Sequence, residues 1–241
     1  MYLRRLERWQ NFEPEYYMLD HLVDPARAAL DVGANEGFYA GRLAQLTKSV
    51  HCFEPIPWFA EELRRKLDPR VVVHQCAVSN RSGSAELRIP YRGETEFHGN
   101  STLEEGNPLL GSTRINLVPC KLARLDDMIS EPVGFIKIDV EGHEISVLEG
   151  AQRILDQHKP VLLIESERRH NAQAPESVFH FLQERGYTGM FLERHHMKGL
   201  PAFRVETHQR LDDLDAENTL GAVRVGARNI YISNFIFLPN G

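Results

Sequence analysis

Short apolar runs alternate with stretches of helical spacing along most of the chain. The apolar runs predict strands at residues 28–32, 50–53, 71–78, 133–140, 161–164, 187–192 and 230–238. Apolar residues at helical spacing predict the intervening helices at residues 38–46, 59–67, 145–155 and 175–185. Because right-handed crossovers pack helices back onto a sheet, this order predicts an α/β fold with a mostly parallel sheet and helices on both faces.

Three segments depart from this alternation. Residues 1–27 form an N-terminal segment of helical character, and residues 193–228 form a late polar insertion whose structure the pattern does not predict. Residues 84–125 contain two short predicted strands, at 85–89 and 117–122, around a polar stretch rich in Gly, Asn and Glu. We therefore expect a single domain over residues 1–241 with a small β insertion.

Charge and cysteine content narrow the function classes. The 241 residues carry a formal net charge of −6, which does not favour a protein that binds nucleic acid through a concentrated basic surface. Cys52, Cys76 and Cys120 lack the paired spacing of a zinc site or a disulfide framework. No signal peptide or membrane-spanning run is predicted. We expect a cytoplasmic protein without nucleic-acid or membrane partners, and its oligomeric state stays open.

A glycine-containing loop joins the first predicted strand to the first predicted helix. The stretch ALDVGANEGFYAGRL places Gly33, Asn35 and Gly37 at this junction. In parallel sheets, ligands bind beyond the carboxyl ends of the strands, and glycines there let the backbone approach a ligand closely. The loop lacks the G-x-G-x-x-G pattern of dinucleotide sites, which disfavours an NAD-linked dehydrogenase.

Glu54 ends the second predicted strand, about 20 residues beyond the loop, where a carboxylate can accept hydrogen bonds from a ribose diol. Alternatively, Glu54 caps the next helix and the two glycines only form a tight turn. The ordered combination of strand, glycine loop, helix, strand and acidic end favours nucleoside binding.

Six stretches between residues 13 and 192 resemble the FkbM family of methyltransferases, which use S-adenosylmethionine. In chain order they are LDVGANEGFYA, HCFEPIPWFAEELRRKL, CAVSNRSGSAEL, LARLDDMI, FIKIDVEGHEISVLEGAQRIL and PVLLIESE, of which IKIDVEGHE is the most specific. The resemblance implies a Rossmann-like class I methyltransferase with a seven-stranded sheet whose last strand is antiparallel. It also implies S-adenosylmethionine as the cofactor and S-adenosylhomocysteine as the product.

The resemblance further implies which residues contact the cofactor. They are Gly33, Asn35 and Gly37 around the methionine portion, Glu54 at the ribose, Pro55 and Ile56 beside the adenine, and Ala77 near its edge, and Asp31 is a further cofactor contact.

Methyl transfer to a hydroxyl also needs a group that removes the acceptor's proton. Asp139, Glu141 and His143 follow the fourth predicted strand, and Glu165 ends the fifth, so these four are the catalytic candidates. Other roles stay open: Asp139 can cap the following helix or bind the cofactor's amino group, and Glu141 can be a favourable first-turn charge. His143 is attractive because imidazole titrates near neutrality.

Metal-assisted chemistry is an alternative that we do not favour. Asp139 and Glu165 could supply two oxygen ligands to Mg²⁺, but the sequence contains no dedicated ligand motif. The polar stretch HGNSTLEEGN, residues 98–107, is typical of a substrate loop or lid, and equally of a surface loop. The family resemblance adds Ser101 and Thr102 in this stretch as candidate substrate contacts.

Together these features predict an S-adenosylmethionine-dependent O-methyltransferase that acts on a hydroxyl of a small natural product or a glycan. A nitrogen acceptor is less favoured because the Asp/Asn-Pro-Pro-aromatic motif is absent after the fourth predicted strand. A non-catalytic nucleoside-binding partner protein is the alternative from a different class.

Overall fold

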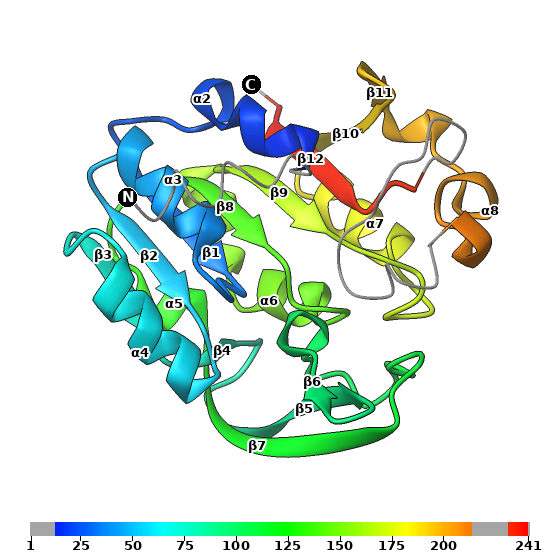
Figure 1. Ribbon diagram of the computed structural model, residues 1–241. Helices are drawn as coiled ribbons and strands as arrows, with labels where there is room; N and C mark the ends of the chain where they lie inside the picture. The colour runs from blue at the N-terminus through cyan, green and yellow to red at the C-terminus, as the bar shows by residue number, and fades with distance from the viewer. Residues whose placement is uncertain (1–12, 214–230, 241) are drawn as a thin grey trace.

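The computed structural model describes residues 13–213 and 231–240. Its main sheet has the order β11-β10-β12-β9-β8-β1-β2-β3 (Figure 1). The strands are β1 (Ala28–Val32), β2 (Val50–Phe53), β3 (Val71–His74), β8 (Val133–Ile138), β9 (Val161–Glu165), β10 (Tyr187–Glu193), β11 (His196–Gly199) and β12 (Asn234–Pro239).

Strand directions confirm the expected class I methyltransferase arrangement. β3, β2, β1, β8 and β9 run parallel to one another, while the last strand, β12, runs antiparallel between β9 and β10. The sheet has one strand more than the seven expected, because β10 continues through a tight hairpin into β11. This edge strand belongs to the late insertion, for which the sequence predicted no structure.

Helices cover both faces of the main sheet (Figure 1). One face packs against η1 (Pro14–Met18), α2 (Leu19–Leu22), α3 (Phe38–Leu46) and α4 (Pro57–Lys66). The opposite face packs against α5 (Leu125–Met128), α6 (Glu144–Glu149), η3 (Ile154–His158) and α7 (Glu176–Gln183). The late insertion adds η4 (Leu200–Ala202), α8 (Val205–His208) and η5 (Leu211–Asp213).

Alternation along the buried strands separates the two cores. In β1, Ala29 packs toward the α3 side, whereas Leu30 and Val32 pack toward the α6 side. In β8, Phe135 and Ile136 divide in the same way. Because successive strand residues point to opposite faces, a strand that is apolar throughout can serve two helical layers.

The insertion at residues 84–125 belongs to a second, smaller sheet with the order β4-β7-β5-β6. These strands are β4 (Ala77–Val78), β5 (Gly83–Arg92), β6 (Thr95–Glu96) and β7 (Arg114–Ala123), and η2 (His98–Asn100) follows β6. The single strand expected at residues 71–78 is therefore wrong. The chain turns at exposed Gln75, where the amide of Cys76 bonds to the carbonyl of His74, and Ala77 then pairs with β7. This turn carries the chain from one sheet into the other.

Candidate active site

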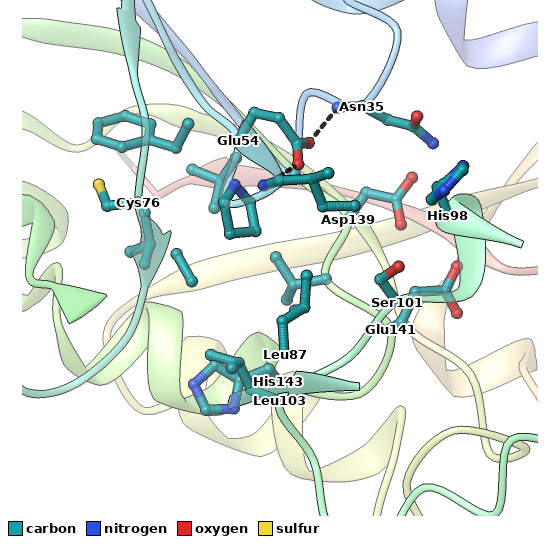
Figure 2. A pocket seen from close by; sticks show the side chains of 18 of the residues that line it. Asn35, Glu54, Cys76, Leu87, His98, Ser101, Leu103, Asp139, Glu141 and His143 are labelled. Carbon is teal, nitrogen blue, oxygen red and sulfur yellow. Dashed lines mark hydrogen bonds between the residues drawn. The ribbon is translucent and has the colours of Figure 1, made fainter. Parts of the chain in front are cut away.

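A pocket lies where the carboxyl ends of β1, β2 and β8 face the small sheet (Figure 2). About 630 Å³ of space lies within it, part of which is open to solvent. Asp139, Ser101, Glu141 and His98 are drawn on one side of the pocket and Cys76 on the other. The sequence-predicted residues that line it are Gly33, Asn35, Glu54, Pro55, Ile56, Ala77, Ser101, Asp139, Glu141 and His143.

The loop after β1 contains two glycines at which any side chain would overlap neighbouring atoms. Gly33 has φ +84°, and a Cβ placed there would lie 1.8 Å from the carbonyl oxygen of Asp139. The absence of a side chain at Gly33 therefore lets the loops after β1 and β8 touch. Gly37, with φ +80°, has a different role: a Cβ there would lie 2.4 Å from Leu63, so this glycine lets α3 approach α4 and does not line the pocket.

Glu54 is buried at the end of β2 and faces this loop. Its Oε2 accepts a hydrogen bond from the amide of Asn35, and its Oε1 accepts one from the amide of Ile56, each at 2.8 Å (Figure 2). Burial raises the pKa of Glu54 to about 7, against the effect of these two donors. Each carboxylate oxygen has a second lone pair, so the side chain can fix the loop and still accept hydrogen bonds from a ligand.

Apolar side chains from both sheets form the rest of the pocket wall. Ile56, Ala77 and Leu87 belong to one buried cluster, and Leu103 packs against it. Apolar walls of this kind suit a flat ring system. The strand turn at Cys76 places Ala77 in this wall.

Residues 31–188 match the family model of the methyltransferase FkbM domain. The chain belongs to the FkbM methyltransferase family. A solved FkbM methyltransferase from Methylobacillus flagellatus KT is 20% identical, with a TM-score of 0.52 over 76% of this chain and 45% of that chain. SMU.1697c from Streptococcus mutans, described as a candidate methyltransferase in complex with SAH, is 13% identical, with a TM-score of 0.50 over 93% of this chain and 94% of that one. These likenesses confirm the fold. No curated protein gave a significant match.

Beneath the glycine loop, this FkbM family member buries a row of charged side chains on neighbouring strands. Asp31 of β1 is the register partner of Lys137 of β8, and Glu165 of β9 is the partner of Asn234 of β12. The Lys137 Nζ lies 3.6 Å from Asp139 Oδ2 and 3.9 Å from Glu165 Oε2. The row occupies the face of the sheet that α3 covers, so Asp31 and Glu165 lie below the pocket and do not line it.

The charges in this row depend on one another. Burial lowers the pKa of Lys137, but the carboxylates of Asp139, Glu13 and Glu165 outweigh it and raise that pKa well above its ordinary value. Burial raises the pKa of Asp31 to about 7, while the Lys137 charge opposes this rise. Burial and the charge of Asp139 raise the pKa of Glu165 well above its ordinary value. Lys137 was missed in the sequence, where its signal is a single cation inside an apolar strand.

His143 lines the pocket, but both of its ring nitrogens have partners. Nδ1 lies 2.5 Å from Glu104 Oε1, and Nε2 lies 3.0 Å from the Ser79 hydroxyl. This chain of contacts joins the first turn of α6 to the small sheet and to the 98–107 segment. A proton acceptor needs a lone pair that faces its substrate. The geometry therefore favours a structural role for His143, in which it links neighbouring segments, over the role of a base.

Glu141 has a left-handed backbone conformation, with φ +53°, which is uncommon for a residue with a side chain. Its Oε2 lies 2.6 Å from His170 Nε2. Burial lowers the pKa of His170, but the carboxylates of Glu141 and Glu167 outweigh burial and raise it to about 10. His170 is therefore a cation beside the Glu141 side chain at the pocket wall. Nothing in the sequence around His170 indicated this pairing.

The 98–107 segment is fastened to the loop that carries Glu141. The Thr102 hydroxyl and the Asn107 side-chain amide both donate to the carbonyl oxygen of Glu141, at 2.8 and 2.9 Å. Thr102 also forms a β-bridge with Arg88, so its hydroxyl faces this loop and not the pocket. Ser101 does line the pocket, and its buried Oγ has no hydrogen-bond partner.

Within residues 13–213 and 231–240, no group of three or more His, Cys, Asp or Glu side chains is arranged to hold a metal ion. The two carboxylates considered as Mg²⁺ ligands, Asp139 and Glu165, instead flank the ammonium group of Lys137. None of the helices in the described part of the chain is long and apolar enough to cross a membrane.

Proposed function

We propose that the protein is an S-adenosylmethionine-dependent O-methyltransferase that acts on a hydroxyl of a small natural product or a glycan. The observation that carries this proposal is one pocket that joins the glycine loop and Glu54 to the carboxylates of Asp139 and Glu141. The family membership supports methyl transfer, and the carboxylates support a hydroxyl acceptor because they can take its proton.

The residues fit the cofactor on three grounds. Gly33 lets the loops after β1 and β8 meet at the pocket, Glu54 offers oxygen lone pairs at the end of β2, and Ile56 and Ala77 provide apolar walls. The partnerless Ser101 hydroxyl marks a place where a ligand would complete the hydrogen bonding. S-Adenosylmethionine, when bound, supplies a methyl group that its sulfonium already activates.

The chain's own residues would bind the cofactor, contact the acceptor and accept its proton. Glu54 would hold the ribose hydroxyls, Asn35 would contact the methionine portion, and Asp139 would bind the cofactor's amino group. Glu141 would accept the proton of the acceptor hydroxyl, and His170 would keep this side chain oriented. Ser101 would contact the acceptor or the cofactor. In this assignment Glu165, Asp31 and Lys137 form the charged support beneath the site.

Cofactor binding is tested by thermal melts of the wild type and Glu54→Gln with S-adenosylmethionine, S-adenosylhomocysteine, NAD and no ligand. Glutamine retains one acceptor oxygen for the loop amides, and Glu61→Gln on the exposed surface of α4 is the matched control. We expect stabilisation by the two sulfur nucleosides alone, with affinity at least about tenfold weaker in Glu54→Gln and unchanged in Glu61→Gln. A cooperative melt that no sulfur nucleoside shifts would contradict the proposal.

Catalysis is tested by transfer of a labelled methyl group across a library of hydroxyl compounds. Glu141→Gln should bind the cofactor like the wild type and lose about 10²-fold or more in kcat. If the wild type binds the cofactor but methylates no member of the library, the non-catalytic nucleoside-binding alternative is favoured. Methylation of amines but not of hydroxyls would favour the nitrogen acceptor.

A further inference from the structure

A second pocket lies on the other side of the contact between Glu141 and His170. Its empty volume is about 570 Å³. Arg92, Arg169 and His170 contribute cationic groups to its wall, Asn100 and Asn107 contribute amides, and the remaining lining is proline and leucine. Among the described residues that line this pocket, none is acidic. Cations and amide groups around an otherwise apolar cavity are the chemistry of a site for an organic anion.

Two of the cations are held rigidly from behind. The Arg169 guanidinium donates two hydrogen bonds to Glu167, at 2.6 and 2.7 Å, and His170 lies 3.4 Å from the same carboxylate. The hydroxyl of buried Tyr231 also donates to Glu167. Burial opposes ionisation of Glu167, but these contacts outweigh it and hold its pKa well below the ordinary range. Arg169 and His170 therefore reach the pocket already oriented, so a ligand has little ordering to induce.

Arg92 comes from the end of β5, on a different element. Its guanidinium lies 5.1 Å from the Phe97 ring and donates to the Leu110 carbonyl at 3.3 Å. The pKa of Arg92 is lowered first by partial burial and second by the charge of Arg169. Two guanidinium groups from separate elements thus line one cavity, where an anion can meet both.

The second pocket shares a wall with the candidate active site. Glu141 lines the active site and His170 lines the second pocket, with 2.6 Å between their paired atoms. Asn107, in the second pocket, donates to the carbonyl oxygen of Glu141. Ser101 and Asn100 are consecutive residues that line the first and the second pocket, respectively. The proposed base therefore stands in the wall between the two pockets, next to the second one.

We propose that the second pocket binds a phosphate or carboxylate group of the acceptor and thereby directs a hydroxyl of the same molecule toward Glu141. This inference rests on the proposed function and names its substrate class: an acceptor that carries both an anionic group and a hydroxyl. The preoriented guanidinium of Arg169 donates to the anion and Arg92 closes on it from β5, while His170, whose ring nitrogens face Glu141 and Asn107, lies behind them. The apolar lining contacts the carbon skeleton between the two groups.

The test compares Arg92→Gln with Arg114→Gln. Both substitutions remove one arginine charge from the same antiparallel pair of strands, but Arg114 does not line the pocket and has a side chain that is 58% exposed. The probes are inorganic phosphate, glucose 1-phosphate, glucuronate and neutral glucose. Each is titrated at constant ionic strength into the protein saturated with S-adenosylhomocysteine. Calorimetry gives the dissociation constants, and a separate titration of S-adenosylhomocysteine reports on the cofactor site of each variant.

We expect the anionic probes to bind and glucose not to bind at the same concentrations. Arg92→Gln should weaken binding of the anions at least tenfold, and Arg114→Gln should leave it within a factor of two. Binding of glucose 1-phosphate or glucuronate more tightly than inorganic phosphate identifies a group on an organic acceptor as the ligand. Equal or tighter binding of inorganic phosphate identifies a site for the free ion and overturns the acceptor assignment.

The proposed function and this inference fail separately. If S-adenosylhomocysteine binds but no anion binds, or if both arginine variants weaken the anions equally, the inference is overturned and the proposed function stands. If S-adenosylhomocysteine does not bind the wild type, the proposed function fails whatever the anions do. In the transfer assay, acids should exceed their neutral methyl esters at least tenfold in kcat/KM, and Arg92→Gln should remove this preference mainly through KM.

Discussion

The two faces of the central strands differ only at their carboxyl ends. On the face toward α6 and α7, β1, β8 and β9 present apolar residues along their whole length: Leu30, Val32, Ile136, Ile138, Leu162 and Ile164. On the face toward α3, the apolar residues Ala29, Phe135 and Leu163 are followed by the charged residues Asp31, Lys137 and Glu165. Burying charge is costly, and within these three strands it is confined to the end of one face, beneath the glycine loop. In β1, β8 and β9, apolar packing is therefore given up only beneath the edge that carries the candidate site.

Lys137→Met against Ile136→Val tests this contrast most strongly, because the two residues are neighbours on opposite faces. Removing the ammonium leaves Asp139 and Glu165 without their shared cation, and we expect the free energy of unfolding to fall by about 3–5 kcal/mol. Ile136→Val should lose only about 0.5–1.5 kcal/mol. Urea denaturation at pH 7 measures both. Equal losses would mean that the charged row contributes no more than ordinary packing.

Gly33→Ala against Gly186→Ala tests whether the loop above the charged row is as constrained as the contacts indicate. Both glycines have positive φ, but only Gly33 has a neighbour where its Cβ would lie. We expect about 1 kcal/mol from the backbone strain at Gly186, and about 2–4 kcal/mol at Gly33 from strain plus overlap with Asp139. The same thermal melts should show that only Gly33→Ala loses stabilisation by S-adenosylmethionine. Similar losses in the free energy of unfolding for the two variants would show that the loops after β1 and β8 can separate with little loss of stability.

The pH dependence of stability should distinguish the charged face from the apolar one. The Asp31 pKa is about 7 in the folded chain and returns toward its ordinary value of 3.8 on unfolding. Between these values the folded chain holds a proton that the unfolded chain releases, so this group lowers stability as pH rises from about 4 to 7. The slope reaches about 1.4 kcal/mol per pH unit. Asp31→Asn should reduce the slope of the free energy of unfolding against pH by that amount. Urea unfolding at pH 5, 6 and 7 measures this slope. An unchanged slope would mean that Asp31 is ionised in the folded protein.

Glu165→Gln should have the smallest effect, because burial and the charge of Asp139 keep this carboxyl's pKa well above its ordinary value. Glutamine keeps the shape of the side chain, and Lys137 retains Asp139 as its nearer ionic partner, so we expect a loss below about 1 kcal/mol at pH 7. A loss as large as that of Lys137→Met would show instead that Glu165 forms an ionised pair with the lysine.

The sequence predicted the central sheet well because its strands are continuous apolar runs. The ranges of β1, β2 and α3 agree with the predicted ranges, and the parallel order followed from alternation with helices. The strand at residues 71–78 was wrong because Cys76 and Ala77 are as apolar as Val71 and Val73, and composition does not reveal a change of sheet. Likewise, β11 pairs through a short polar hairpin, for which periodicity gives no signal.

The candidate site could be predicted only where it follows from strand ends. Gly33, Glu54 and Asp139 each follow a buried strand, and the carboxyl ends of parallel strands meet at one edge. The contacts from His143 to Glu104 and from Glu141 to His170 join segments about 30 to 40 residues apart, where local pattern carries no information. The roles of all these residues, as well as the single-domain organisation, remain predictions.

The hydrogen bonds from Thr102 and Asn107 to the carbonyl of Glu141 tie the 98–107 segment to the loop after β8. A motion that lifts this segment must either break both bonds together or pull the Glu141 backbone along with it. If Glu141 is the proposed base, the second kind of motion would displace the base whenever the segment opens. An acceptor would then meet Glu141 in its reactive position only in the closed arrangement.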